Sequence, residues 1–243
     1  MKPTPSQLFI LVIIFSWIPI NQVFSQEIHG DPDVWFLQLT NYQLSEKWSV
    51  GNELHQRFTN YLGSREQLLI RPFVNYHFNT AVTATFGYTY IHTWPYGDYP
   101  LPIEKPENNI WEQINLRHDV NRWVIQHRYR LEHRWQGDII NQTDGSFAVD
   151  GYSFSQRFRY RLTATYPINE KSFINLFDEL WVRNASDIHT IVYDRNWLYL
   201  GLGYHLSSAV SAQIAYLHQH IQNNPTRTER HPGIQMTLQV NLK

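Results

Sequence analysis

The chain of 243 residues contains no cysteine, only five lysines, and a formal net charge of −1 at pH 7. Without cysteine it can form no disulfide, no thiolate metal site and no cysteine nucleophile. A near-neutral charge also argues against a nucleic-acid-binding protein, which would carry a basic surface. We therefore expect no nucleic-acid partner, and a fold that depends on hydrogen bonding and packing rather than on covalent cross-links.

Long apolar runs are scarce as well. The clearest run, Leu8–Phe15, follows Lys2 and precedes Val23-Phe24-Ser25, which is the order of a secretory signal peptide. It is shorter than the ~20 residues that an ordinary membrane-spanning helix needs, although a retained anchor helix is the alternative. We predict a cleaved signal peptide over residues 1–25 and a single domain over residues 26–243.

What the chain has in abundance is alternation of apolar and polar residues. The stretch Ile234–Lys243 alternates to its last residue, and Phe154–Leu162 places aromatic residues and leucine on one side and three arginines on the other. Period 2 is the period of a β-strand. Similar segments occur at about 33–44, 48–58, 65–78, 82–94, 110–119, 122–135, 151–166, 172–183, 193–206, 209–222 and 232–243. Many span ten to fourteen residues, which suits tilted membrane strands of ~9–11 residues.

The connections between these segments alternate between short and long. Short ones lie near 44–47, 79–81, 120–121, 168–171 and 207–208, and longer ones near 59–64, 95–109, 136–150, 184–192 and 223–231. This alternation is typical of outer-membrane barrels, which have short periplasmic turns and long external loops. The sequence therefore predicts an all-β, transmembrane, antiparallel up-and-down β-barrel of 10–12 strands with a polar, arginine-rich lumen.

The number of strands has two interpretations. Eleven segments are visible, whereas bacterial single-chain barrels normally have an even number of strands. Either segment 33–44 lies outside the wall, which gives ten strands, or a short strand near 26–32 or inside a long loop has been missed, which gives twelve. We slightly favour twelve.

Period 2 also assigns residues to the two faces of the wall. In segment 122–135, Trp123 and Trp135 mark the two ends of the apolar face, and charged residues occupy the other face. The residues expected to line the lumen are Glu53, Arg57, Arg71, Arg117, Arg128, Arg130, Glu132, Arg134, Arg157, Arg159, Arg161, Glu179, Arg183 and Arg195. Arginine predominates, with Glu132 and Glu179 the only carboxylates near Arg128–Arg130 and Arg157–Arg161, so a strongly basic lumen is expected. It could be a packed network of charges or an open pore that prefers anions.

Several stretches of the chain resemble a known family. They are Arg128–Arg134, Arg157–Arg161, Asp178–Trp181 and Asn196–Tyr204, together with Trp35 and Trp48-Ser49-Val50. They resemble the domain-of-unknown-function 2490 family, a family of bacterial proteins common in Bacteroidetes. The resemblance covers nearly the whole expected mature chain and implies an outer-membrane barrel. It implies no activity.

Catalytic and cofactor motifs are missing from the sequence. It has no glycine-rich phosphate loop, no His-Glu-x-x-His helix motif and no Gly-x-Ser-x-Gly elbow, so we expect no metal, no cofactor and no enzyme. The expected role is that of a structural or interaction barrel, or of a passive porin-like channel for small anionic solutes, with a lipid-modifying enzyme as the alternative. Its expected location is the outer membrane of a Gram-negative bacterium. Its expected partners are outer-membrane lipids, lipopolysaccharide and the barrel assembly machinery, with the protein itself a monomer.

Overall fold

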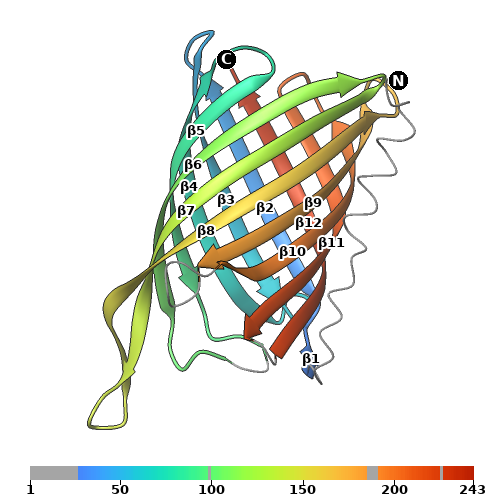
Figure 1. Cartoon of the computed structure of the whole chain (residues 1–243). Coiled ribbons are helices and arrows are strands. Elements are labelled where there is room, and N and C mark those ends of the chain that lie inside the picture. Colours follow the sequence, from blue (N-terminus) through green and yellow to red (C-terminus); the bar gives the residue numbers. More distant parts are fainter. Residues whose placement is uncertain (1–26, 98–99, 185–190, 225–226) are drawn as a thin grey trace, which may run out of the picture.

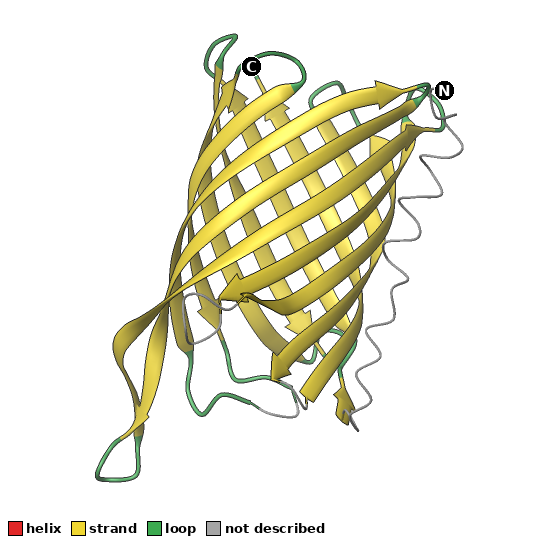
Figure 2. Cartoon of the chain, in the orientation of Figure 1, coloured by secondary structure: helices red, strands yellow, loops and turns green. Residues whose placement is uncertain are grey.

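The computed structural model describes residues 27–97, 100–184, 191–224 and 227–243. The expected signal peptide lies outside the described residues. All regular structure in those ranges is β-strand (Figure 2). None of the described residues form a helix long and apolar enough to cross a membrane. The strands are β1 (Glu27–His29), β2 (Asp33–Gln43), β3 (Trp48–Thr59), β4 (Ser64–His77), β5 (Val82–Thr93), β6 (Lys105–Val120), β7 (Trp123–Asn141), β8 (Phe147–Pro167), β9 (Ser172–Asn184), β10 (Ile191–His205), β11 (Val210–Asn224) and β12 (Arg227–Leu242).

The strands form one tilted, closed barrel (Figure 1). Each strand from β2 to β12 pairs antiparallel with its neighbour in the chain, as predicted for an up-and-down barrel. Each of the eleven predicted segments corresponds to one of these strands. The segment near 33–44, which a ten-stranded barrel would leave outside the wall, is β2 and belongs to the wall.

The closure of the barrel corrects the expectation of an even strand number. Strand β2 pairs with β12 in the parallel sense, with Asp33 opposite Gly233. Strand β1 also pairs parallel with β12, with Glu27 opposite Arg227, so it continues the line of β2 after a break at residues 30–32. A strand does exist near 26–32, but it adds no position to the wall, which has eleven. With an odd number the first and last strands run in the same direction, and parallel hydrogen bonding can still join them.

Tight turns connect the strands at one end of the barrel, which we call the short-turn end. Asn79 accepts hydrogen bonds from the backbone of Ala81 and Val82, and Asn169 accepts them from Lys171 and Ser172. Such side-chain contacts stabilise a reversal of the chain locally. The turn between β6 and β7 is closed by Asn121, whose φ of 56° asparagine tolerates better than most residues.

At the opposite end, which we call the long-loop end, β7 and β8 continue beyond the wall as a projecting ribbon (Figure 1). Pairing of β7 with β6 ends at Gln136, and pairing of β8 with β9 begins at Arg157. The paired residues from Gly137 to Tyr152 therefore pair only with one another, and most of the segment expected as a loop at 136–150 is strand. A register shift after Gly137 and a φ of 84° at Gly151 lie where the ribbon leaves the wall.

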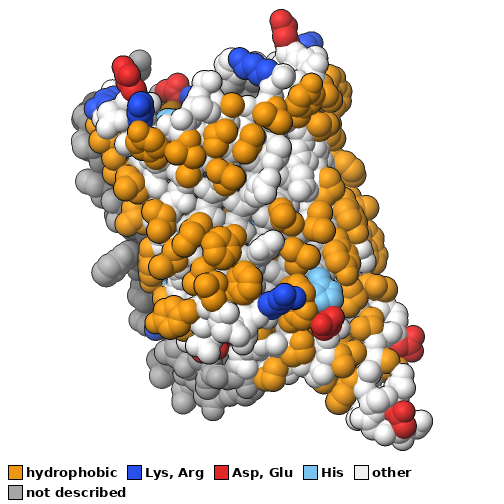
Figure 3. All heavy atoms as spheres, turned by 180° about the vertical axis from the view of Figure 1, so that it is seen from behind, with side chains coloured by type: hydrophobic (Ala, Val, Ile, Leu, Met, Phe, Trp, Pro, Cys, Tyr) orange, Lys and Arg blue, Asp and Glu red, His pale blue; other side chains and the backbone are white. Residues whose placement is uncertain are grey.

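The wall has the inverted arrangement of a membrane barrel. Outward side chains such as Phe86, Leu200, Leu202 and Ile214 are more than half exposed. Many inward side chains, including several arginines and glutamates, are buried. On the face shown in Figure 3, hydrophobic side chains cover most of the wall, and charged ones gather toward its two ends and on the ribbon. This distribution matches an apolar band between two polar rims, as in transmembrane barrels.

Candidate functional site in the barrel interior

The charged centre of the barrel interior comes from the alternation of strands β7, β8 and β9. Antiparallel register places Glu132 opposite Arg157, Arg130 opposite Arg159, and Arg128 opposite Arg161. The next strand places Glu179 opposite Arg161. Residues directly opposite each other on one face have Cβ atoms ~5 Å apart, so these charged groups must meet inside the barrel.

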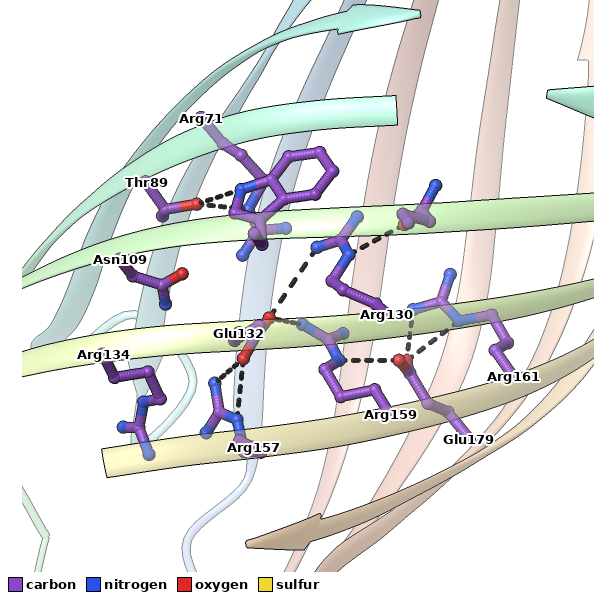
Figure 4. Close-up of polar contacts among 12 residues, drawn as sticks. Arg71, Thr89, Asn109, Arg130, Glu132, Arg134, Arg157, Arg159, Arg161 and Glu179 are labelled. Carbon is purple, nitrogen blue, oxygen red and sulfur yellow. Dashed lines mark hydrogen bonds and ion pairs between the residues drawn. The ribbon is translucent and has the colours of Figure 1, made fainter. Parts of the chain in front are cut away.

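Two carboxylates organise these arginines (Figure 4). Glu132 accepts hydrogen bonds from Arg157 Nε at 2.7 Å and from Arg159 Nη1 at 2.7 Å. Glu179 accepts them from Arg159 Nε at 2.8 Å, from Arg161 Nε at 2.9 Å, and from Arg128. Arg159 thus joins the two carboxylates, and the Glu132 and Glu179 side chains are at most 1% exposed.

Further ion pairs extend this network toward other strands. Glu53 on β3 accepts a hydrogen bond from Arg71 on β4 at 2.6 Å, and Arg134 binds both oxygens of Glu107, at 2.7 and 2.8 Å. Asp194 on β10 lies between Arg157, at 3.5 Å, and Arg195, at 3.2 Å. Each of these carboxylates lowers the cost of burying the neighbouring guanidinium, which would be high without a partner.

Aromatic rings fill the space around the guanidiniums. The guanidinium carbon of Arg159 lies 3.6 Å from the centre of the Trp181 ring, and those of Arg130 and Arg57 lie 3.9 Å from the Trp111 and Trp35 rings. A planar guanidinium stacks on such rings, which a lysine ammonium does less well. Gly87 lies under Trp111, where any Cβ would come within 2.2 Å of the indole. This close contact accounts for glycine at that position.

Packing continues from one side of the barrel to the other. Trp35 on β2 and Trp197 on β10 meet edge to face with ring centres 5.2 Å apart, and Trp197 also contacts Trp181 on β9 at 4.5 Å. These rings, with Tyr199, Ala215 and Leu217, form a buried hydrophobic cluster in the interior. Arg57 on β3 lies 5.5 Å from the Trp197 ring. At the height of these rings, side chains from β2, β3, β9 and β10 contact one another in the barrel interior.

The predicted lumen residues do not all lie in this packed region. The side chains of Arg57, Arg71, Arg130, Glu132, Arg134, Arg157, Arg159 and Glu179 are buried, and those of Glu53, Arg128, Arg161 and Arg195 are partly exposed. Arg183 is half-buried near the end of β9. Arg117 lies at the short-turn end, where its side chain is 48% exposed and 3.6 Å from Asp119.

The alternation pattern did not place several carboxylates that the structure shows in the barrel interior. They reduce the strong excess of positive charge that was expected in the lumen. Glu66 and Asp194 are buried at register shifts on β4 and β10, where the alternation of faces breaks. Glu107 lies in the segment taken as a loop, although the series Glu107, Asn109, Trp111 and Gln113 continues the alternation of β6 and could have placed it. Asp33 begins β2 and is also buried.

These features define a transmembrane β-barrel with a charged and aromatic interior. The family model described as "Protein of unknown function (DUF2490)" matches residues 33–230, so the chain belongs to this family, as its motifs indicated. Among solved structures the chain is similar to one titled "NanC porin structure in rhombohedral crystal form", with 14% identity, coverage of 77% of this chain and 80% of that chain, and a TM-score of 0.46. Comparison with curated proteins finds no match.

Proposed function

We propose that this chain is a bacterial outer-membrane protein whose barrel is closed at mid-height, and that it serves as a structural or interaction barrel rather than as a passive channel. The burial of the bridging network supports closure. The Arg159 side chain is 3% exposed and the carboxylates on its two sides are at most 1% exposed. Water and ions have little access to a region in which such groups are hidden, whereas an open pore would expose them.

The orientation in the membrane follows from the two ends of the barrel. We propose that the short turns face the periplasm, and that the long loops and the projecting ribbon face outward, as in other outer-membrane barrels. Export would follow removal of the signal peptide 1–25, and folding would need the barrel assembly machinery. The monomer would contact outer-membrane lipids and lipopolysaccharide through its apolar band.

A lipid-modifying barrel enzyme would need a serine hydroxyl within hydrogen-bonding distance of a histidine, and Ser153 and Ser155 lie on the strand next to His133. In the structure His133 faces outward and contacts Glu112 at 3.2 Å and Gln156 at 3.1 Å. Ser155 is on the inner face with a buried hydroxyl, and Ser153 donates a hydrogen bond to Asp138 at 2.6 Å. Neither hydroxyl contacts His133, so these residues do not support this alternative, and we propose a protein without enzymatic activity.

Release of solutes from vesicles tests the closed barrel. The mature protein is reconstituted into liposomes filled with a small anionic dye, and we expect release no faster than from protein-free liposomes. As a matched variant, Trp35→Ala combined with Trp197→Ala removes two large rings from the packed interior and should increase release. Rapid release by the wild-type protein, equal to that of the double variant, would contradict the proposal.

A further inference from the structure

The inner face of the barrel becomes more exposed to solvent toward the short-turn end. At mid-height, Arg130 and Glu132 on β7 are 1% exposed. Two and four residues closer to the short-turn end on the same face, the Arg128 side chain is 14% exposed and Gln126 is exposed. Strand β8 shows the same trend, from Arg159 at 3% to Arg161 at 21%. Water therefore reaches the inner wall at this end but not the network above it.

Six side chains from three adjacent strands form a donor-rich surface in this hydrated region, which we call the basic wall. Register places Asn115 of β6, Arg128 of β7 and Arg161 of β8 in one row. It places Arg117, Gln126 and Thr163 in the next row toward the short-turn end. Neighbours on one face lie ~5 Å apart directly and ~7–8 Å diagonally, so a small ligand can contact several of them together.

The donors of the basic wall are largely unused. Arg128 contacts Glu179 through Nη2, and Arg161 contacts it through Nε and Nη2. Nη1 of both arginines therefore remains without a hydrogen-bond partner in the described ranges, as does the buried Nε of Arg128. The side chains of Asn115, Gln126 and Thr163 also make no hydrogen bond with any described residue. A guanidinium with free N–H groups in reach of water is a suitable site for an oxyanion.

Nearby carboxylates do not neutralise the basic wall. Glu179 already accepts hydrogen bonds from three arginines, and Glu53 on the facing strand is engaged by Arg71 and His55. Asp119 lies 3.6 Å from Arg117, and its side chain is 62% exposed, so it screens that arginine only weakly. Three arginines thus share a face of the wall that otherwise presents amide and hydroxyl groups.

We propose that the basic wall binds a water-soluble oxyanion, such as a phosphate or carboxylate group, which enters from the short-turn end and stops below the packed interior. The residues carrying this site are Asn115, Arg117, Gln126, Arg128, Arg161 and Thr163. The ligand comes from the aqueous phase rather than from a lipid headgroup, because all six residues lie on the inner face of the wall. Binding at this site does not require the barrel to conduct, because the ligand needs access from one end only.

Calorimetric titration of the mature protein with inorganic phosphate tests the proposal, in zwitterionic detergent micelles at constant ionic strength maintained with chloride. Saturable binding at one site is expected, and Arg117→Gln should weaken it by about tenfold, the effect of losing one charge-assisted hydrogen bond. Arg128→Lys keeps the charge but loses the planar donor geometry, and it should also weaken binding. Lys171→Gln removes a positive charge from the same end of the barrel and should leave the affinity unchanged.

Two further comparisons make the outcome decisive. Adding phosphatidylglycerol to the micelles should not compete with phosphate, and competition would show that the site takes a lipid headgroup, which would overturn the aqueous route. Absence of saturable phosphate binding by folded wild-type protein would overturn the site itself. An equal loss of affinity in Lys171→Gln and Arg117→Gln would reduce the effect to general charge attraction and would also overturn it.

Discussion

At the scale of single residues, the interior arginines depend on a small number of shared carboxylates. Arg159 is the link between Glu132 and Glu179, and its guanidinium also lies on the Trp181 ring. Removing one partner from a buried ion pair leaves an uncompensated charge, which costs more than the pair itself contributes. The network is therefore most sensitive at Arg159, which the two central carboxylates share.

The substitution Arg159→Glu tests this dependence. It replaces the shared cation by a third carboxylate between two buried ones, and we expect the free energy of unfolding to fall by about 3–5 kcal/mol or more. Urea titrations of refolded protein in detergent or liposomes would measure the change. Arg117→Glu reverses the charge of an exposed residue and should cost no more than about 1 kcal/mol. Equal costs for the two would show that the interior is hydrated rather than packed.

The two faces of the wall give a second test at residue scale. Ile214 faces outward and is 54% exposed, while its neighbour Gln213 faces inward. Ile214→Arg should destabilise the barrel by about 2–4 kcal/mol if it lies near the bilayer midplane, and Gln213→Arg should be milder because its side chain does not meet lipid. Refolding titrations in liposomes would compare them. A larger cost at Gln213 would mean that the two faces have been exchanged.

At the scale of the strands, sequence patterning predicts an element well where the alternation is unbroken. Strand β7 places Arg128, Arg130, Glu132 and Arg134 on the inner face, as period 2 predicts. Register shifts beside Glu66 and Asp194 cannot be seen in a pattern that assumes strict alternation, because one extra residue moves the following side chains to the other face. Contacts between distant strands, such as Trp35 with Trp197, form only when the barrel closes. The residues near each of them in the sequence therefore do not predict these contacts.

The projecting ribbon of β7 and β8 allows a prediction at this scale. Since the paired residues of 137–152 pair only with one another, replacing residues 138–150 by a tight turn should remove no hydrogen bond between β7 or β8 and the other wall strands. We expect the shortened barrel to refold and to unfold in urea within about 1 kcal/mol of the full chain, since surface changes away from buried features have small effects. Heat-dependent migration on gels would report folding. Failure of the shortened chain to form a barrel would show that the ribbon is needed to nucleate the wall.

At the scale of the whole molecule, the absence of cysteine, the long alternating strands and the alternation of short and long connections were sufficient to predict a membrane barrel. They were not sufficient for the strand number, because the joining of β2 to β12 is a contact between the two ends of the domain. Trp35 and Trp197, which meet in the interior, are also far apart in the sequence. The sequence alone is therefore compatible with both an open pore and a packed interior. The contacts among Trp35, Trp181, Trp197 and Arg159 favour the packed interior.

The most direct measurement of closure uses the natural lack of cysteine, which makes any introduced thiol unique. Thr163→Cys places a thiol on the inner face toward the short-turn end, and Thr93→Cys places one on the inner face toward the long-loop end. In sealed vesicles of uniform orientation, a membrane-impermeant thiol reagent is added to one side at a time. The closed barrel predicts that each cysteine reacts from its own side alone. Reaction of either cysteine from both sides would contradict the closed interior.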